Sequence, residues 1–224
     1  MEGLKRTINL AMEDGLVKEN PFKYIHFKRE RGERRRLTID EIKQLQAYDA
    51  PVESHRYHAK NMFLFSFYTG GGRFEDIVLL EWRHIKNGTL HFSMGKTGKQ
   101  FSITLLPEAM EIIKLYEHRR DQKYIFPLMP EHITRDDIVT FKQTVNAKNS
   151  LVNKKLSVIA KHLELEPFTF HVARHSIADY LRLKGVDLYT ISKVLRHSDL
   201  KTTEIYLKQF DADSVSAEFA KAFE

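Results

Sequence analysis

The sequence predicts a mainly α-helical fold with one small antiparallel β-sheet, an α+β arrangement. Apolar residues recur every three or four positions in most of the chain, which is the spacing of one helix face. Residues 89–105 instead alternate polar and apolar residues in two neighbouring runs, which predicts a β-hairpin. The chain has 224 residues, 42% hydrophobic and 29% charged, as in ordinary globular proteins. That length can form one large domain or two small ones.

Turn and capping residues set the expected helix boundaries. Thr38 and Glu41 are the two ends of a capping box, so a helix begins there and runs to about Ala47. Pro107 suits the first turn of a helix, and Asp187 suits an N-cap. The expected helices are 4–15, 38–47, 56–68, 73–80, 107–120, 134–147, 151–162, one that begins near residue 171 and ends at Gly185, 187–195, a short one around Tyr206, and 211–223.

The small sheet is expected from two or three short strands. Residues 89–94 and 100–105 alternate polar and apolar side chains, and the glycine- and lysine-rich residues 95–99 join them. Residues 124–126 are a candidate for a third strand. The sheet therefore lies at an edge of a helical domain.

Three consecutive glycines, Gly70–Gly72, end the most apolar of the expected helices. We expect a sharp turn that delivers Arg73 from the start of a buried helix. A phosphate-binding loop is the other interpretation of such a triplet, but the G-K-[ST] ending of a Walker motif is missing.

Composition limits the possible functions. The net charge is +6 and the isoelectric point is near 9.3, which favours a polyanionic partner. Cysteine is absent, so disulfides and thiolate metal sites are excluded. The sequence has no apolar run long enough to span a bilayer and no signal-peptide pattern at its start.

Four side chains in the C-terminal third suit phosphodiester chemistry. His171 and Arg174 are three residues apart, on one face of a helix; His197 follows an apolar helical run, and Tyr206 comes nine residues later. A phenol with a pKa of about 10 is a weak nucleophile at neutral pH and needs activating neighbours. An arginine can neutralise the nonbridging phosphate oxygens, and a histidine can move a proton or donate a hydrogen bond.

Two segments resemble the catalytic boxes of the tyrosine recombinases, the phage integrase family. The family pattern is H-x-x-R and then L-G-H-S-x-x-x-T-T-x-x-Y, and here it is His171-Val-Ala-Arg174, Leu195-Arg196-His197-Ser198, Thr202-Thr203 and Tyr206. The segment FSFYTGGGRFEDIVLLEW resembles the first box, in which an acid follows the arginine by three residues. Two positions depart from the pattern, since Arg196 stands at a usual glycine and Gly72 at a usually larger residue.

The resemblance extends over about Thr38 to Phe210 and implies the fold of a tyrosine recombinase catalytic domain. It implies a site-specific recombinase that cuts and rejoins DNA through a 3′-phosphotyrosine. The implied catalytic residues are Arg73, Lys96, His171, Arg174, His197 and Tyr206, with Asp76 supporting the site. Lys99 is the alternative to Lys96 as the acid that protonates the leaving 5′ oxygen. The first box is most similar in style to integrases of mobile elements in Bacteroides-like bacteria.

The resemblance also implies partners and a domain division. Residues 1–36 are expected to be the end of an upstream core-binding domain plus a basic linker, 37–210 the catalytic domain, and 211–224 a C-terminal helix or tail. Double-stranded DNA and further copies of the chain, four in a synapse, are the implied partners, with no membrane, metal ion, ATP or other cofactor. The implied location is the bacterial cytoplasm, with the nucleoid.

Basic residues outside the catalytic set are possible DNA contacts. They belong to the linker, the hairpin and one of the later helices: Arg34, Arg35, Arg36, Lys99, Lys154 and Lys155. A plain solvated surface is the other interpretation of these residues.

The same residues allow three other interpretations of the function. Residues 187–208 also fit a helix-turn-helix, which would make the chain a DNA-binding protein without chemistry, but this leaves the first box and the hairpin lysines unexplained. His171 and His175 are four residues apart and could share a zinc ion, although no third ligand is evident nearby. Type IB topoisomerases use the same chemistry but do not usually have this pair of boxes.

Overall fold

The computed structural model describes residues 2–22, 35–93 and 100–196. The chain divides into two compact units, Met1–Glu33 and Arg34–Glu224. The first unit contains helix α1 (Glu2–Glu13), where a helix was expected. The side chain of Asn20 donates a hydrogen bond to Oδ1 of Asn9 at 2.6 Å, which holds the loop after α1 against the helix.

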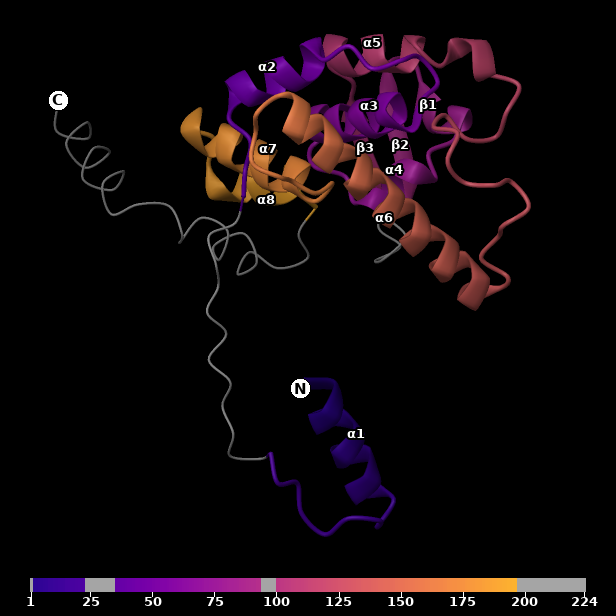
Figure 1. The fold of residues 1–224 in the computed structure, drawn as a ribbon, viewed down its shortest axis with the longest axis vertical. Helices are drawn as coiled ribbons and strands as arrows, with labels where there is room; N and C mark the ends of the chain where they lie inside the picture. The colour runs from indigo at the N-terminus through magenta and orange to yellow at the C-terminus, as the bar shows by residue number, and fades with distance from the viewer. Residues whose placement is uncertain (1, 23–34, 94–99, 197–224) are drawn as a thin grey trace, which may run out of the picture. The chain divides into compact units, whose positions relative to one another are not determined.

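Helix α3 (His55–Tyr68) is the centre of the second unit. Ten of its fourteen residues are buried, which is the pattern of a helix enclosed by other elements. The helices that contact it are α2 (Ile39–Ala47), α4 (Phe74–Val78), α5 (Pro107–Lys114), α6 (Ile138–His162) and α7 (Val172–Leu183). Figure 1 shows α7 beside α8 (Leu188–Val194). The predicted mainly α-helical fold is confirmed.

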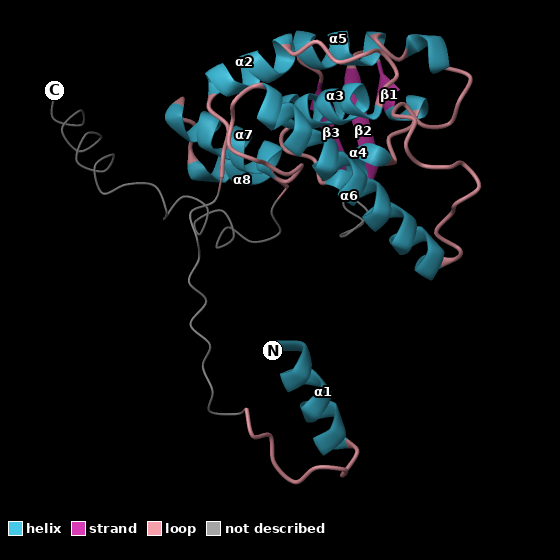
Figure 2. Cartoon of the chain, viewed as in Figure 1, coloured by secondary structure: helices cyan, strands magenta, loops and turns pink. Residues whose placement is uncertain are grey.

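Three antiparallel strands form the sheet, in the order β1 (Ile85–Lys86), β2 (Thr89–Ser93) and β3 (Gln100–Thr104) (Figure 2). The β2–β3 pairing is the one that the alternating pattern predicted. The third strand is not at residues 124–126, where Tyr124 forms only an isolated bridge with Glu81. It is β1, which turns into β2 through Asn87-Gly88, two residues of positive φ as in a tight two-residue hairpin.

A single helix, α6, replaces the two that were expected over 134–147 and 151–162. Residues 148–150 include neither glycine nor proline, so the backbone has no reason to stop there. Its buried side chains continue one apolar face along the whole helix: Phe141, Val145, Val152, Leu156 and Ile159. The first turns of α6 extend away from the rest of the unit (Figure 1). Among the described residues, no helix combines the length and the apolar composition needed to span a bilayer.

Short 3-10 helices complete the unit. Helix α5 ends at Lys114, and a separate turn, η2 (Glu117–Arg119), occupies the rest of the expected 107–120 helix. The turn η1 (Trp82–His84) follows α4 and leads into β1. The predicted N-cap of α8 is confirmed, because the side chain of Asp187 accepts a hydrogen bond from the backbone of Thr190 at 3.0 Å.

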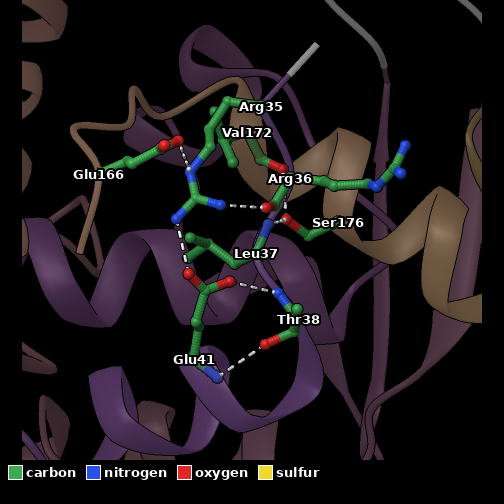
Figure 3. A network of polar contacts seen from close by, with 8 residues as sticks. All are labelled: Arg35, Arg36, Leu37, Thr38, Glu41, Glu166, Val172 and Ser176. Carbon is green, nitrogen blue, oxygen red and sulfur yellow. Dashed lines mark hydrogen bonds and ion pairs between the residues drawn. The ribbon is translucent and has the colours of Figure 1, made fainter. Parts of the chain in front are cut away.

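The end of the linker is attached to both α2 and α7 (Figure 3). Thr38 Oγ1 accepts a hydrogen bond from the Glu41 backbone at 3.2 Å, and Glu41 Oε2 accepts one from the Thr38 backbone at 2.7 Å, which is the predicted capping box. The other Glu41 oxygen is 2.6 Å from Nη2 of Arg35. The Leu37 backbone donates to Oγ of Ser176 in α7 at 2.8 Å. The direction in which the chain enters this unit is therefore fixed by polar contacts.

The turn between α3 and α4 lies directly against α7. Gly70 and Gly71 have φ values of +80° and +70°, which favour glycine. A Cβ atom at Gly71 would lie 2.8 Å from Cα of Arg174, closer than real Cβ atoms come. The glycines thus allow an approach of two backbones that no larger residue permits.

The capping box gives a stability prediction with a pH dependence. Burial raises the pKa of Glu41, but the hydrogen bond from Thr38 and the neighbouring Arg35 outweigh it, so the net shift is downward. A lowered carboxyl pKa contributes stability above the unfolded-state pKa of 4.5 that is lost as the pH falls through the folded-state value. Glu41→Ala should therefore lower the free energy of unfolding by about 1–2 kcal/mol at neutral pH, measured by urea denaturation.

The matched control is Asp40→Ala, which removes an exposed acid from the same first turn and should cost less than about 0.5 kcal/mol. The deficit of Glu41→Ala should shrink in acid. A deficit that stays constant between neutral pH and about pH 3 would show that the charge of Glu41 does not contribute.

Two glycines with the same φ of +70° allow steric contact to be separated from backbone strain. Gly88 has nothing within 4 Å of a built Cβ atom, whereas Gly71 meets the backbone of Arg174. Gly88→Ala should cost about 1–2 kcal/mol from strain alone. Gly71→Ala should cost at least about 2 kcal/mol more, because α7 or the turn must move. Equal losses in urea denaturation would mean that the turn does not pack against α7 as described.

Candidate active site

An aromatic contact brings Arg73 and His171 to the same region. Phe74, which follows Arg73, packs edge to face on Phe170, which precedes His171, with ring centres 5.3 Å apart. Phe170 also contacts Phe63 of α3, at 6.3 Å between ring centres. The start of α4 and the start of α7 are thus held together by the core, and each presents a candidate catalytic side chain.

Arg174 joins three segments by hydrogen bonds from a buried guanidinium. Its side chain is 3% exposed. Nη1 donates to the carbonyl of Gly71 at 2.8 Å, and Nη2 donates to the carbonyl of Leu195. Hydrogen bonds from a charged donor contribute about 1.5–3 kcal/mol each. The arginine of the second box therefore fixes both the turn that leads to Arg73 and the backbone that leads to His197.

Arg73 and Asp76 lie at the start of α4. Arg73 is the N-cap residue of the helix and is half-buried, while Asp76 is buried in the first turn. A carboxylate in the first turn interacts favourably with the exposed backbone N–H groups at a helix N-terminus. Asp76 is thus a buried carboxylate near the start of α4, and its supporting role stays a prediction.

Arg196 is a further buried cation that the sequence analysis noted only as a departure from the family pattern. Its Nη2 donates to the carbonyl of Thr69 at 2.5 Å. Burial, together with the positive charges of Arg174 and Arg73 and against the opposing charge of Asp76, lowers the pKa of Arg196 to about 9. Arg174, Arg73 and Asp76 therefore each lie near enough to Arg196 to influence its charge. In the sequence, this residue could have been found as an arginine at a position where the family usually has glycine.

The histidines of α7 lie at its first turn. His171 precedes the helix and is exposed, and its ring meets the ring of His175 edge to face, with centres 4.6 Å apart. In the part of the chain that the structure describes, no group of three or more His, Cys, Asp or Glu side chains could hold a metal ion.

Several predicted site residues lie outside the described residues: Arg34, Lys96, Lys99, His197 and Tyr206, together with the short helix around Tyr206 and the tail 211–224. Their roles stay predictions. The structure thus brings close together the backbone segments that carry Arg73, Asp76, His171 and Arg174 from the predicted set.

The possible DNA contacts that the structure describes differ in their surroundings. Arg35 pairs with Glu41, and Nε of Arg36 is 3.2 Å from Oδ2 of Asp179. Lys154 is exposed on α6 and Lys155 is half-buried. Contact with a phosphate would require the two arginines to exchange or share their carboxylate partners, which weakens the interpretation of Arg35 and Arg36 as DNA contacts.

Comparison with known proteins identifies the family. The model of the phage integrase family matches residues 35–213. The chain is 28% identical over 182 residues to tyrosine recombinase XerD of Rickettsia bellii and 30% identical over 180 residues to tyrosine recombinase XerC of Caldanaerobacter subterraneus subsp. tengcongensis. Each match covers 76% of this chain, but only 58% and 46% of the respective relative. The chain thus spans about half the length of these relatives.

Solved structures share the fold. A Tn1549 transposon integrase in complex with a circular intermediate DNA has a TM-score of 0.70 at 16% identity, covering 97% of this chain and 76% of that one. A lambda integrase dimer bound to a COC′ core site has a TM-score of 0.65 at 18% identity, covering 91% of this chain and 56% of that one. The model of the family matches well over half of the residues of this chain, and the fold agrees with that match. The chain belongs to the phage integrase family of tyrosine recombinases.

Proposed function

We propose that the chain contains the catalytic domain of a site-specific DNA recombinase that cuts and rejoins strands through a 3′-phosphotyrosine intermediate. The observation on which this depends is the buried guanidinium of Arg174, which bonds to the turn before Arg73 and to the backbone before His197. One side chain thereby organises the candidate residues of both boxes. The relatives named tyrosine recombinases support the reaction, and similar integrase structures solved with DNA support the substrate.

The cleavage step follows from the chemistry of the proposed residues. Arg73 and Arg174 bind the nonbridging oxygens of the scissile phosphate, whose negative charge increases in the transition state. Tyr206 attacks phosphorus and loses its proton, with His171 assisting, while His197 donates to a nonbridging oxygen.

The products determine how the strands rejoin. The bond from phosphorus to the 5′ oxygen breaks as the bond to the tyrosine oxygen forms, and Lys96, or alternatively Lys99, protonates the leaving oxygen. The 5′ hydroxyl of a partner strand then attacks the 3′-phosphotyrosine and releases the tyrosine. Since each step exchanges one phosphoester for another, the bond energy is retained and ATP is not needed.

Three further parts of the proposal concern the context of this reaction. Residues 1–36 are the end of a core-binding domain plus the linker, 37–210 are the catalytic domain, and 211–224 are a C-terminal segment. Four copies act on two duplexes in the bacterial cytoplasm. The host element is a mobile element of Bacteroides-like bacteria, a part of the proposal that the style of the first box supports.

Covalent trapping tests the proposed nucleophile. Nicked duplex DNA bearing the end of the host element loses a short strand on cleavage, so the reverse step is blocked. Wild type should form a protein–DNA band that resists denaturation, and Tyr206→Phe should form none. The DNA affinity of Tyr206→Phe should remain within about twofold of wild type, because one hydroxyl contributes little beside many phosphate contacts.

A band that persists in Tyr206→Phe would mean that another residue is the nucleophile. Tight, salt-sensitive binding without any band in wild type, repeated with a longer chain that includes a core-binding domain, would favour the non-catalytic DNA-binding protein instead.

Arg174→Ala tests the organising role of the buried guanidinium. The cleavage rate per folded molecule should fall at least about a hundredfold, because a preorganised donor to the transition state is lost. The melting temperature should also fall, because two buried carbonyls lose their donor. Arg182→Ala on the same helix is the matched control, since Arg182 pairs with Asp179 away from the turn, and its rate should change less than about threefold. Equal rates for the two variants would contradict the assignment.

A further inference from the structure

The backbone of Arg196 is in a conformation that arginine disfavours. Its φ is +60°, in the left-handed region, directly after the last turn of α8. Glycine is the usual residue where a helix ends in this way, because a Cβ atom is strained there. The guanidinium must therefore make interactions that offset the strain of the backbone.

The guanidinium of Arg196 lies on the glycine turn. The side chain is buried, and Nη2 donates to the carbonyl of Thr69 at 2.5 Å. Cβ atoms built on Gly70 and Gly72 would each be 3.5 Å from a terminal nitrogen of Arg196. A Cβ atom at position 72 would meet Ile77 first, at 2.6 Å from Cδ1, and would be in ordinary contact with the guanidinium. The two departures from the family pattern, at 72 and at 196, thus lie beside each other.

Arg196 and Arg174 hold the same turn at different points. Arg174 bonds to the carbonyl of Gly71, and Arg196 to the carbonyl of Thr69. Arg73 follows this turn directly, so its position depends on both bonds. Asp76 provides a carboxylate near the guanidinium of Arg196.

We propose that Arg196 is a positioning residue for the phosphate site, which fixes the Thr69–Gly72 turn and thereby the approach of Arg73 to the scissile phosphate. This inference rests on the proposed cleavage reaction. Arg196 acts through the turn and does not itself touch the phosphate, so its loss reduces the cleavage rate and leaves DNA binding nearly unchanged.

The informative variant is Arg196→Gly, because glycine relieves the strain of the positive φ while removing the guanidinium. In single-turnover trapping on nicked DNA, the cleavage rate should fall about tenfold to a hundredfold, the effect of losing one charge-assisted hydrogen bond. The Kd for DNA should stay within about twofold, with an unchanged salt dependence. Arg196→Lys, which can still donate to Thr69, should be intermediate in rate. Arg83→Ala, which removes an exposed arginine outside the site, should match wild type.

Hydrogen exchange without DNA tests the turn independently of activity. The amides of Thr69, Gly70 and Gly71 donate hydrogen bonds to carbonyls of α3. In Arg196→Gly, peptides covering residues 66–75 should exchange faster than in wild type, whereas peptides of α5 and the sheet should not change. This measurement does not depend on Tyr206 or on any DNA site.

Three results would overturn the inference. A cleavage rate of Arg196→Gly within about threefold of wild type would exclude a positioning role. A weaker Kd with a salt slope reduced by about one would show that Arg196 contacts a phosphate directly. Unchanged exchange in residues 66–75 would show that Arg196 does not hold the turn. If wild type forms no adduct, the proposed function fails, and the exchange result alone decides whether Arg196 fixes the turn.

Discussion

The hydrogen bonds of Arg174 to two backbone carbonyls are the interaction on which the candidate site depends. They join Gly71, 103 residues earlier in the chain, to Leu195 at the end of α8. Burying a guanidinium costs desolvation free energy, so such a group is retained only where its donors have partners. Moving either carbonyl away would cost a buried cation one of its hydrogen bonds. This energetic penalty holds the turn, α7 and the end of α8 in their relative positions.

Aromatic packing supplies the rigidity behind those bonds. Phe63 of α3 contacts both Phe168 and Phe170, with ring centres 5.1 and 6.3 Å away. The backbone of Phe170 also donates to Oδ1 of Asn153 in α6 at 2.8 Å. The segment before α7 is therefore fixed from two sides. The contact of Leu37 with Ser176 extends this scaffold to the linker, so a change in the direction of the linker would act directly on α7.

The errors of the sequence predictions have local physical causes. The break expected between two helices near residue 148 is absent because lysine, asparagine and serine are tolerated in a helix when its apolar face continues. Residues 124–126 were a candidate for the third strand, whereas Asn87-Gly88, a dipeptide typical of tight hairpins, joins the additional strand β1 to β2.

The sequence by itself determined the fold class, the capping box at Thr38 and the order of the two boxes, because these depend on local spacing and on residue types. Only the tertiary structure decided what the arginines contact. Arg35 and Arg36 pair with carboxylates, and Arg196 reaches back to Thr69, 127 residues away. No periodicity encodes such contacts, because a long, flexible charged side chain takes the partners that packing brings within its reach, and packing joins segments that are far apart in the chain.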